Sequence, residues 1–217
     1  MTVRLALFDC DGTLVDGQAG VCNAMDQAFA DAGLPSPDRH LVRRIVGLSL
    51  PQAIRSLAPE ASDAQHAEIE LAYRSRFRAS RESGALAEPL YDGMAELVAD
   101  LAEAGWVLGV ATGKSARGLE HCLATHGLTR HFTTLQTADQ HPSKPHPAMV
   151  HAALAEGGAE AEHCVMIGDT AFDMAMAQAA GVRALGVDWG YHAPAELVEA
   201  GAEAVAMSPA HLRELIG

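Results

Sequence analysis

Basic residues are scarce in this chain, and their scarcity argues against one class of partner. The 217 residues include 15 lysines and arginines against 28 aspartates and glutamates, which gives a formal net charge of −13. Binding nucleic acid without sequence preference requires a basic surface that neutralises backbone phosphates, so we expect no nucleic-acid partner. A phosphorylated substrate is still compatible, because a bound cation can make one site positive on an acidic protein.

Long apolar runs are also missing. No segment approaches the roughly 20 apolar residues of a membrane-spanning helix, and the short apolar stretch before Asp9 lacks the longer apolar region and the cleavage site of a secretory leader. The four cysteines (Cys10, Cys22, Cys122 and Cys164) form no C-x-x-C pair, which favours free thiols in a reducing compartment. We therefore expect a cytoplasmic protein with no membrane partner.

The chain does contain a regular alternation of short apolar runs and amphipathic helical patterns. Strands are expected at 3–8, 106–111, 132–136, 164–167 and 182–187, and helices at 94–104, 115–126, 147–156 and 171–180. Repeated strand–helix alternation produces a parallel sheet whose two faces are covered by helices. The predicted fold class is therefore α/β, a doubly wound parallel sheet with a Rossmann-like core.

Residues 17–86 interrupt this alternation. Helical patterns over 20–33, 38–45, 51–57 and 64–80 follow one another without a clear strand. We expect an α/β core built from residues 1–16 and 87–217, with a small helical domain of residues 17–86 inserted after the first strand. The length of 217 residues suits one domain with such an insert.

Polar residues follow the expected strands where each one ends. Asp9 and Asp11 follow the first strand, Thr112, Gly113 and Lys114 the second, Lys144 lies in the loop after the third, and Asp169 and Asp173 follow the fourth. Each piece alone is as typical of a turn or a helix cap as of a site. Ligands of doubly wound sheets bind beyond the carboxyl ends of the strands, so together these residues predict one crevice. Carboxylates gathered there repel one another, and Mg²⁺ is the cation that best suits phosphate chemistry.

Four motifs in this order resemble those of the haloacid dehalogenase-like hydrolase superfamily. They are Asp9-Cys10-Asp11-Gly12-Thr13-Leu14-Val15-Asp16, Ala111-Thr112-Gly113-Lys114, Lys144-Pro145 and Gly168-Asp169-Thr170-Ala171-Phe172-Asp173. The resemblance covers essentially the whole chain, and the insert is similar to the family's helical cap. Dehalogenating members generally lack the second aspartate, Asp11 here, whereas phosphatases and phosphomutases keep it. Among these, the chain looks most like the phosphoglycolate phosphatase and pyrophosphatase branch.

The resemblance implies a role for each motif residue. Asp9 would attack phosphorus and become an aspartyl phosphate, while Asp11 would protonate the leaving group and then activate water. Lys144 would offset negative charge on the nucleophile and the phosphoryl group. The remaining implied roles are phosphate binding by Thr112 and Gly113, Mg²⁺ binding by Asp9, the Asp11 main-chain carbonyl and Asp169, and orientation of a metal-bound water or of Lys144 by Asp173.

The cap offers candidates for recognising the leaving group, namely Arg43, Arg44, Gly47 and Ser49. Successive residues of a helix diverge by about 100°, so Arg43 and Arg44 cannot both point into the site if that segment is helical. The other cap arginines are expected on the surface: Arg55, Arg74, Arg76, Arg78 and Arg81.

These roles predict a Mg²⁺-dependent hydrolase of phosphoric monoesters that acts on a small phosphorylated metabolite, with a phosphoglycolate-like compound as the best match. A sugar phosphomutase similar to β-phosphoglucomutase and an inorganic pyrophosphatase share the motifs and stay open as alternatives. A non-enzymatic phospho-acceptor module of the response-regulator kind would lack both the cap and the acid equivalent to Asp11. Both a monomer and a homodimer are compatible with the sequence.

Overall fold

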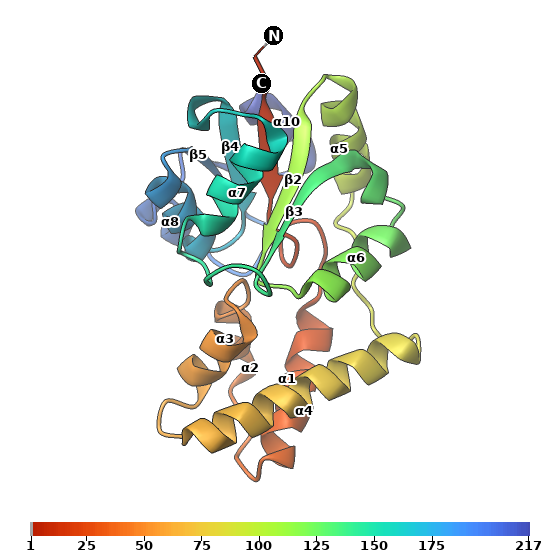
Figure 1. The fold of residues 1–217 in the computed structure, drawn as a ribbon, viewed down its shortest axis with the longest axis vertical. Coiled ribbons are helices and arrows are strands. Elements are labelled where there is room, and N and C mark those ends of the chain that lie inside the picture. The colour runs from red at the N-terminus through yellow and green to blue at the C-terminus, as the bar shows by residue number, and fades with distance from the viewer. Residues whose placement is uncertain (1) are drawn as a thin grey trace.

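Residues 2–217, which a computed structural model describes, contain a six-stranded parallel sheet with helices on both faces (Figure 1). The strands are β1 (Leu5–Phe8), β2 (Val107–Thr112), β3 (Phe132–Thr137), β4 (Cys164–Gly168), β5 (Arg183–Val187) and β6 (Ala204–Ala206). Their order in the sheet is β3-β2-β1-β4-β5-β6, and every neighbouring pair is parallel. The predicted α/β fold class is confirmed.

The central strand β1 explains why its sequence is continuously apolar. Side chains of a strand alternate between the two faces of the sheet. Ala6 and Phe8 pack into one core cluster, and Leu5 and Leu7 pack into the other. All four side chains are fully buried because helices cover both faces.

Six α-helices of the described chain follow the strands. They are α5 (Met94–Glu103), α6 (Ala116–Thr125), α7 (Ala148–Gly157), α8 (Ala171–Ala180), α9 (Pro194–Glu199) and α10 (Pro209–Ile216). The first core cluster includes residues of α5, α6 and α10, and the second includes residues of α7, α8 and α9. The sequence analysis named no element after residue 187, so α9, β6 and α10 are additions to the predicted fold.

Four further helices gather at the carboxyl ends of the strands, below the sheet in Figure 1. They are α1 (Gln18–Asp31), α2 (Arg39–Arg44), α3 (Leu50–Leu57) and α4 (Asp63–Glu82). These helices enclose a separate cluster of buried residues that includes Met25, Phe29 and Ile69. We call α1–α4 the cap and the rest the core, while the exact boundaries at residues 16 and 87 remain a prediction.

Two segments connect the cap to the core, and they run side by side. The amide of Asp16 donates to the carbonyl of Pro89 at 2.8 Å, and the amide of Tyr91 donates to the carbonyl of Leu14 at 3.0 Å. Both crossings therefore lie at one place, which leaves the far end of the cap without a covalent connection to the core. None of the helices within residues 2–217 is both long enough and apolar enough to cross a membrane.

Candidate active site

The turn after β1 carries Asp9 and Asp11, and its shape depends on Gly12. Gly12 has φ +86°, a left-handed conformation that side chains with a Cβ rarely adopt. A Cβ at this position would also collide with the carboxylate of Asp169. The glycine therefore allows the turn after β1 to approach the loop after β4 closely.

Asp9 is fully buried and held by one of its two carboxylate oxygens. Asp9 Oδ1 accepts a hydrogen bond from the amide of Cys10 at 2.7 Å and lies 2.9 Å from the ammonium of Lys144. Asp9 Oδ2 has no hydrogen-bond partner among residues 2–217. Burial, opposed by Lys144 and reinforced by Asp173 and Asp11, raises the pKa of Asp9 to about 7. The carboxylate is thus fixed in orientation while one oxygen stays available.

Lys144 lies between Asp9 and Asp173. Its ammonium is 2.6 Å from Asp173 Oδ1, and all three side chains are fully buried. Burial alone would lower the pKa of Lys144, but Asp173 and Asp9 outweigh that effect and raise it, so the lysine stays charged. The other oxygen of Asp173 accepts from the amide and hydroxyl of Thr170 at 3.0 and 2.7 Å. This capping box at the start of α8 fixes Asp173, which in turn positions Lys144.

Asp9, Asp169 and Asp173 form a buried acidic cluster whose ligand atoms lie within 4.8 Å of one another. Asp169 accepts from the hydroxyl of Thr13 at 2.9 Å and from the amide of Tyr191 at 3.0 Å. Burial, together with Asp9 and Asp173, raises the pKa of Asp169 well above its ordinary value. Three buried carboxylates with one lysine leave uncompensated negative charge, which fits a divalent cation with oxygen ligands.

The donor set also indicates which residues could hold such a cation. Both oxygens of Asp173 are engaged by Lys144 and Thr170. Asp9 Oδ2 lacks a hydrogen-bond partner within the described chain, since Lys144 contacts the other oxygen, Oδ1. Asp9 and Asp169 are therefore the side chains best placed as ligands, and Asp173 is placed as a partner of Lys144.

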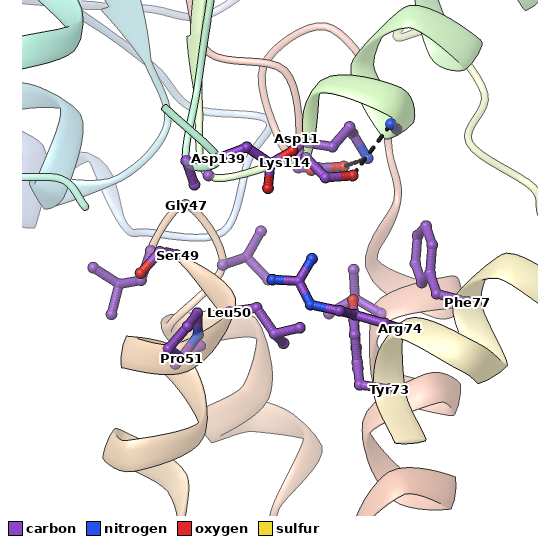
Figure 2. Close-up of a pocket in the computed structure, with 18 of the residues that line it drawn as sticks. Asp11, Gly47, Ser49, Leu50, Pro51, Tyr73, Arg74, Phe77, Lys114 and Asp139 are labelled. Carbon is purple, nitrogen blue, oxygen red and sulfur yellow. Dashed lines mark hydrogen bonds and ion pairs between the residues drawn. The ribbon is translucent and has the colours of Figure 1, made fainter. Parts of the chain in front are cut away.

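Asp11 is paired with Lys114, a residue to which the sequence analysis gave no role. The ammonium of Lys114 lies 2.9 Å from Asp11 Oδ1 (Figure 2). It also lies 2.7 Å from Glu88 Oε1, and the side chain of Lys114 is only 6% exposed. Burial would lower the pKa of Lys114, but Asp11, Cys10 and Glu88 together raise it well above its ordinary value. The lysine is thus a buried cation that fixes Asp11 at the boundary between core and cap.

Thr112 is the last residue of β2, and Gly113, which follows it, lies against the cap. Thr112 is buried, and its hydroxyl accepts from the amide of Lys114 at 3.2 Å. A Cβ added to Gly113 would lie 2.5 Å from the carbonyl oxygen of Leu48 and 2.6 Å from that of Gly47. Only a glycine at position 113 lets the loop between α2 and α3 rest this closely on the core.

Gly47 is the cap residue that covers Asp9. A Cβ built on Gly47 would lie 3.9 Å from Asp9 Oδ2 and 3.4 Å from the hydroxyl of Thr170. The neighbouring Ser49 donates its amide to the Ser143 hydroxyl at 2.7 Å, across the boundary between cap and core. Of the four cap candidates, Gly47 and Ser49 thus lie at the site.

The two arginine candidates lie elsewhere. Arg43 is exposed, and Arg44 makes two hydrogen bonds of 2.6 Å to the carboxylate of Glu196 in α9. His192 adds a contact of 2.9 Å from its Nε2 to the carbonyl oxygen of Arg44. The structure therefore places Arg44 in a contact that fastens the cap to the core, at a distance from the cavity described next.

A cavity of about 610 Å³ opens between cap and core, next to Asp11 and Lys114 (Figure 2). Tyr73, Arg74 and Phe77 project from α4 toward the core in Figure 2. Three more arginines line the cavity, namely Arg78, Arg81 and Arg117. Arg74 and Arg78 are exposed, as expected from the sequence, and also border the cavity, whereas Arg81 is half-buried. A charged helix face has the same sequence pattern whether it meets solvent or a water-filled cleft.

Comparisons with known proteins show which family the chain resembles in sequence and fold. Residues 6–187 match the family model described as haloacid dehalogenase-like hydrolase. A protein of Dickeya dadantii named probable phosphatase IndB is 36% identical over 197 residues, which cover 89% of this chain and 84% of that protein. A phosphoglycolate phosphatase of Pectobacterium atrosepticum is 30% identical over 195 residues, covering 88% and 82%.

Solved structures show the same fold. The haloacid dehalogenase-like hydrolase SP0104 from Streptococcus pneumoniae superposes with a TM-score of 0.86 at 27% identity, and the match covers 99% of both chains. The family model matches well over half of the chain, and the matched residues include all four sequence motifs set out above. The protein therefore belongs to the haloacid dehalogenase-like hydrolase family.

Proposed function

We propose that this protein is a Mg²⁺-dependent phosphoric monoester hydrolase that works through an aspartyl phosphate on Asp9. The observation that carries the proposal is the state of Asp9: buried, fixed through one oxygen by Cys10 and Lys144, and with the other oxygen unpartnered in the described chain. A carboxylate held in one orientation with a free oxygen is suited to nucleophilic attack on phosphorus. The relatives named as phosphatases support this chemistry.

The other site residues would stabilise charge, transfer protons and bind the metal. Lys144 would stabilise negative charge on the transferring phosphoryl group, because it is already within 2.9 Å of the nucleophile. Asp11 lines the cavity, so it is placed to give a proton to the leaving oxygen and to take one from the attacking water. Mg²⁺, held by Asp9 and Asp169, would supply further positive charge for the phosphoryl oxygens.

The cap would control access and exclude water. In this structure Gly47 covers Asp9, and contacts from Ser49 and Arg44 fasten the cap to the core. Asp9 is fully buried in this state, so the cap has to move away before a substrate can reach it. Closing again would leave only the substrate and the attacking water beside Asp9.

The test is release of inorganic phosphate from a panel of phosphate monoesters, pyrophosphate and sugar phosphates, with Mg²⁺ and with EDTA. We expect release that depends on Mg²⁺ and falls at least about 10³-fold in Asp9→Asn, because the nucleophile is lost. Mass spectrometry after rapid quenching should find a phosphoryl group on the peptide that contains Asp9. Isomerised sugar phosphate without free phosphate would show a mutase, and release from pyrophosphate alone a pyrophosphatase. Wild-type rates in Asp9→Asn would overturn the mechanism.

A further inference from the structure

One face of α4 is arranged in two strips that border the cavity. Arg74, Arg78 and Arg81 are spaced by four and three residues, so they lie along the same side of the helix. Tyr73 and Phe77, four residues apart, form the adjacent strip. All five residues line the cavity.

The aromatic strip supplies part of the apolar lining of the cavity. The rings of Tyr73 and Phe77 are stacked, with centroids 5.6 Å apart and planes inclined by 19°. Apolar side chains from α1, from the loop before α3 and from the start of α3 complete this part of the lining: Val21, Met25, Leu48 and Leu50. The volume of about 610 Å³ falls in the range of roughly 300–1,000 Å³ that is typical of sites for larger organic ligands. Glycolate alone would leave most of this space unfilled.

The arginines differ in whether a carboxylate already neutralises them. Arg74 lies 2.8 Å from Glu70, Arg78 lies 2.7 Å from Glu82, and Arg117 lies 3.8 Å from Glu82 as well. No carboxylate of residues 2–217 lies within ion-pair distance of Arg81, and its buried Nε has no hydrogen-bond partner there. A buried, unpartnered guanidinium nitrogen at a cavity is unfavourable unless a ligand supplies an acceptor.

Phe77 connects Arg81 to the catalytic end of the cavity. The ring of Phe77 lies 5.9 Å from the guanidinium carbon of Arg81 and 5.7 Å from the ammonium of Lys114. Lys114 is in turn paired with Asp11, the residue next to the leaving oxygen in the proposed reaction. A leaving group whose oxygen lies beside Asp11 can therefore extend along the Phe77 ring and reach Arg81.

We propose that the leaving group of the substrate has a flat apolar body, which packs on Tyr73 and Phe77, and a second anionic group, which Arg81 binds. This inference rests on the proposed phosphatase function and names its substrate class. Arg74, Arg78 and Arg117 line the same cavity but are already paired with carboxylates, so Arg81 is the arginine among these four that lacks such a partner within residues 2–217. A planar guanidinium is well suited to bind a carboxylate or phosphate.

The test compares two aryl phosphates that differ only in the charge of the distant group. The probes are 4-carboxyphenyl phosphate and the neutral, similarly shaped 4-carbamoylphenyl phosphate. In Arg81→Gln we expect kcat/KM for the carboxyl ester to fall at least about tenfold, as for loss of one charged hydrogen bond, with less than about a threefold change for the carbamoyl ester. Arg76→Gln is the matched control, because Arg76 is on the same helix but pairs with Asp31 and lies outside this cavity.

A binding measurement separates this inference from the proposed function. Calorimetry with Asp9→Asn, which cannot form the aspartyl phosphate, measures the dissociation constants of both esters without turnover. We expect tighter binding of the carboxyl ester, and loss of that preference in Asp9→Asn/Arg81→Gln.

Hydrolysis of both esters with no selective effect of Arg81→Gln would overturn the inference and leave the phosphatase intact. Selective binding without hydrolysis of any ester would instead overturn the proposed function and retain the anion site. Equal binding of the two esters would refute the anion site in either case.

Discussion

Asp9→Asn should abolish turnover and, at the same time, stabilise the metal-free protein at neutral pH. Asp9 belongs to a buried cluster in which three carboxylates face one lysine. Asparagine has nearly the same shape, and its carbonyl oxygen can still accept from the amide of Cys10. The substitution removes one of the clustered negative charges and leaves Lys144 paired with Asp173. Nucleophiles are commonly costly to stability for this reason.

The size and the pH dependence of the effect follow from the raised pKa. Burial raises the pKa of Asp9 from 3.8 to about 7, and a shift of about three units corresponds to roughly 4 kcal/mol in favour of unfolding once the group is ionised. Between pH 4 and 7 the folded state binds more protons than the unfolded state, so wild-type stability falls as pH rises through this window. The advantage of Asp9→Asn should therefore grow by roughly 2–3 kcal/mol between pH 5 and pH 8.

The assay is thermal or urea unfolding of both proteins in EDTA at several pH values from 5 to 8. For a chain of this length 1 kcal/mol shifts Tm by about 2–4 °C, so the difference is measurable. Asp100→Asn, at an exposed position of α5, controls for the loss of one negative charge from an acidic chain and should change little. A variant that is no more stable than wild type at pH 8, or an advantage that does not vary with pH, would refute the reasoning.

Three further outcomes are expected from the same contacts. Mg²⁺ affinity, measured by calorimetry, should weaken about tenfold from pH 8 to pH 6. The reason is that the pKa of Asp9 is about 7, so a proton competes with the cation for this carboxylate as the pH falls. An affinity that does not change with pH would show that Asp9 is not a ligand. Lys114→Met should lower the free energy of unfolding by about 3–5 kcal/mol, since it leaves Asp11 and Glu88 buried without their cation. The double variant Lys114→Met/Glu88→Gln should recover part of that lost stability in urea titrations. If the double variant recovers none of it, the pairing of Lys114 with Glu88 is contradicted. Gly113→Ala should reduce kcat/KM at least about tenfold with little change in Tm, because the Cβ of the alanine would contact the carbonyl oxygen of Leu48 and keep the cap from resting on the core. Unchanged kinetics would show that the cap can close over the core despite the extra methyl group.

The sequence predicted five of the six strands, and the candidate site residues that follow them lie together at one edge of the sheet. Apolar runs such as 3–8 can be recognised locally, and the residues that follow parallel strands meet at one edge by geometry alone. The short strand β6 has only three residues, Ala204–Ala206, and is too brief for a periodic pattern. Its place in the sheet depends on β5 rather than on its own sequence.

Contacts between cap and core could not be predicted in the same way. Arg44 and Glu196 are 152 positions apart, and nothing local in either segment indicates the pair. Arg81 lies on a helix face whose charged residues recur as they do on a solvated surface. The burial of Lys114 likewise depends on Glu88, from the segment between α4 and α5, and on Phe77 from α4. These residues become identifiable only when the cap is placed on the core.

The two ends of the site have opposite charge, and this has a consequence for the order of binding. The catalytic end holds three buried carboxylates against Lys144, so a phosphate dianion is repelled there until a cation is bound. The far end holds Arg81 without a carboxylate partner in the described chain, so it attracts an anion with or without a metal. A substrate with two anionic groups would therefore bind first through its distant group, and Mg²⁺ would then allow the phosphate to settle beside Asp9. It follows that EDTA should abolish turnover completely while weakening the binding of 4-carboxyphenyl phosphate less than that of its carbamoyl analogue.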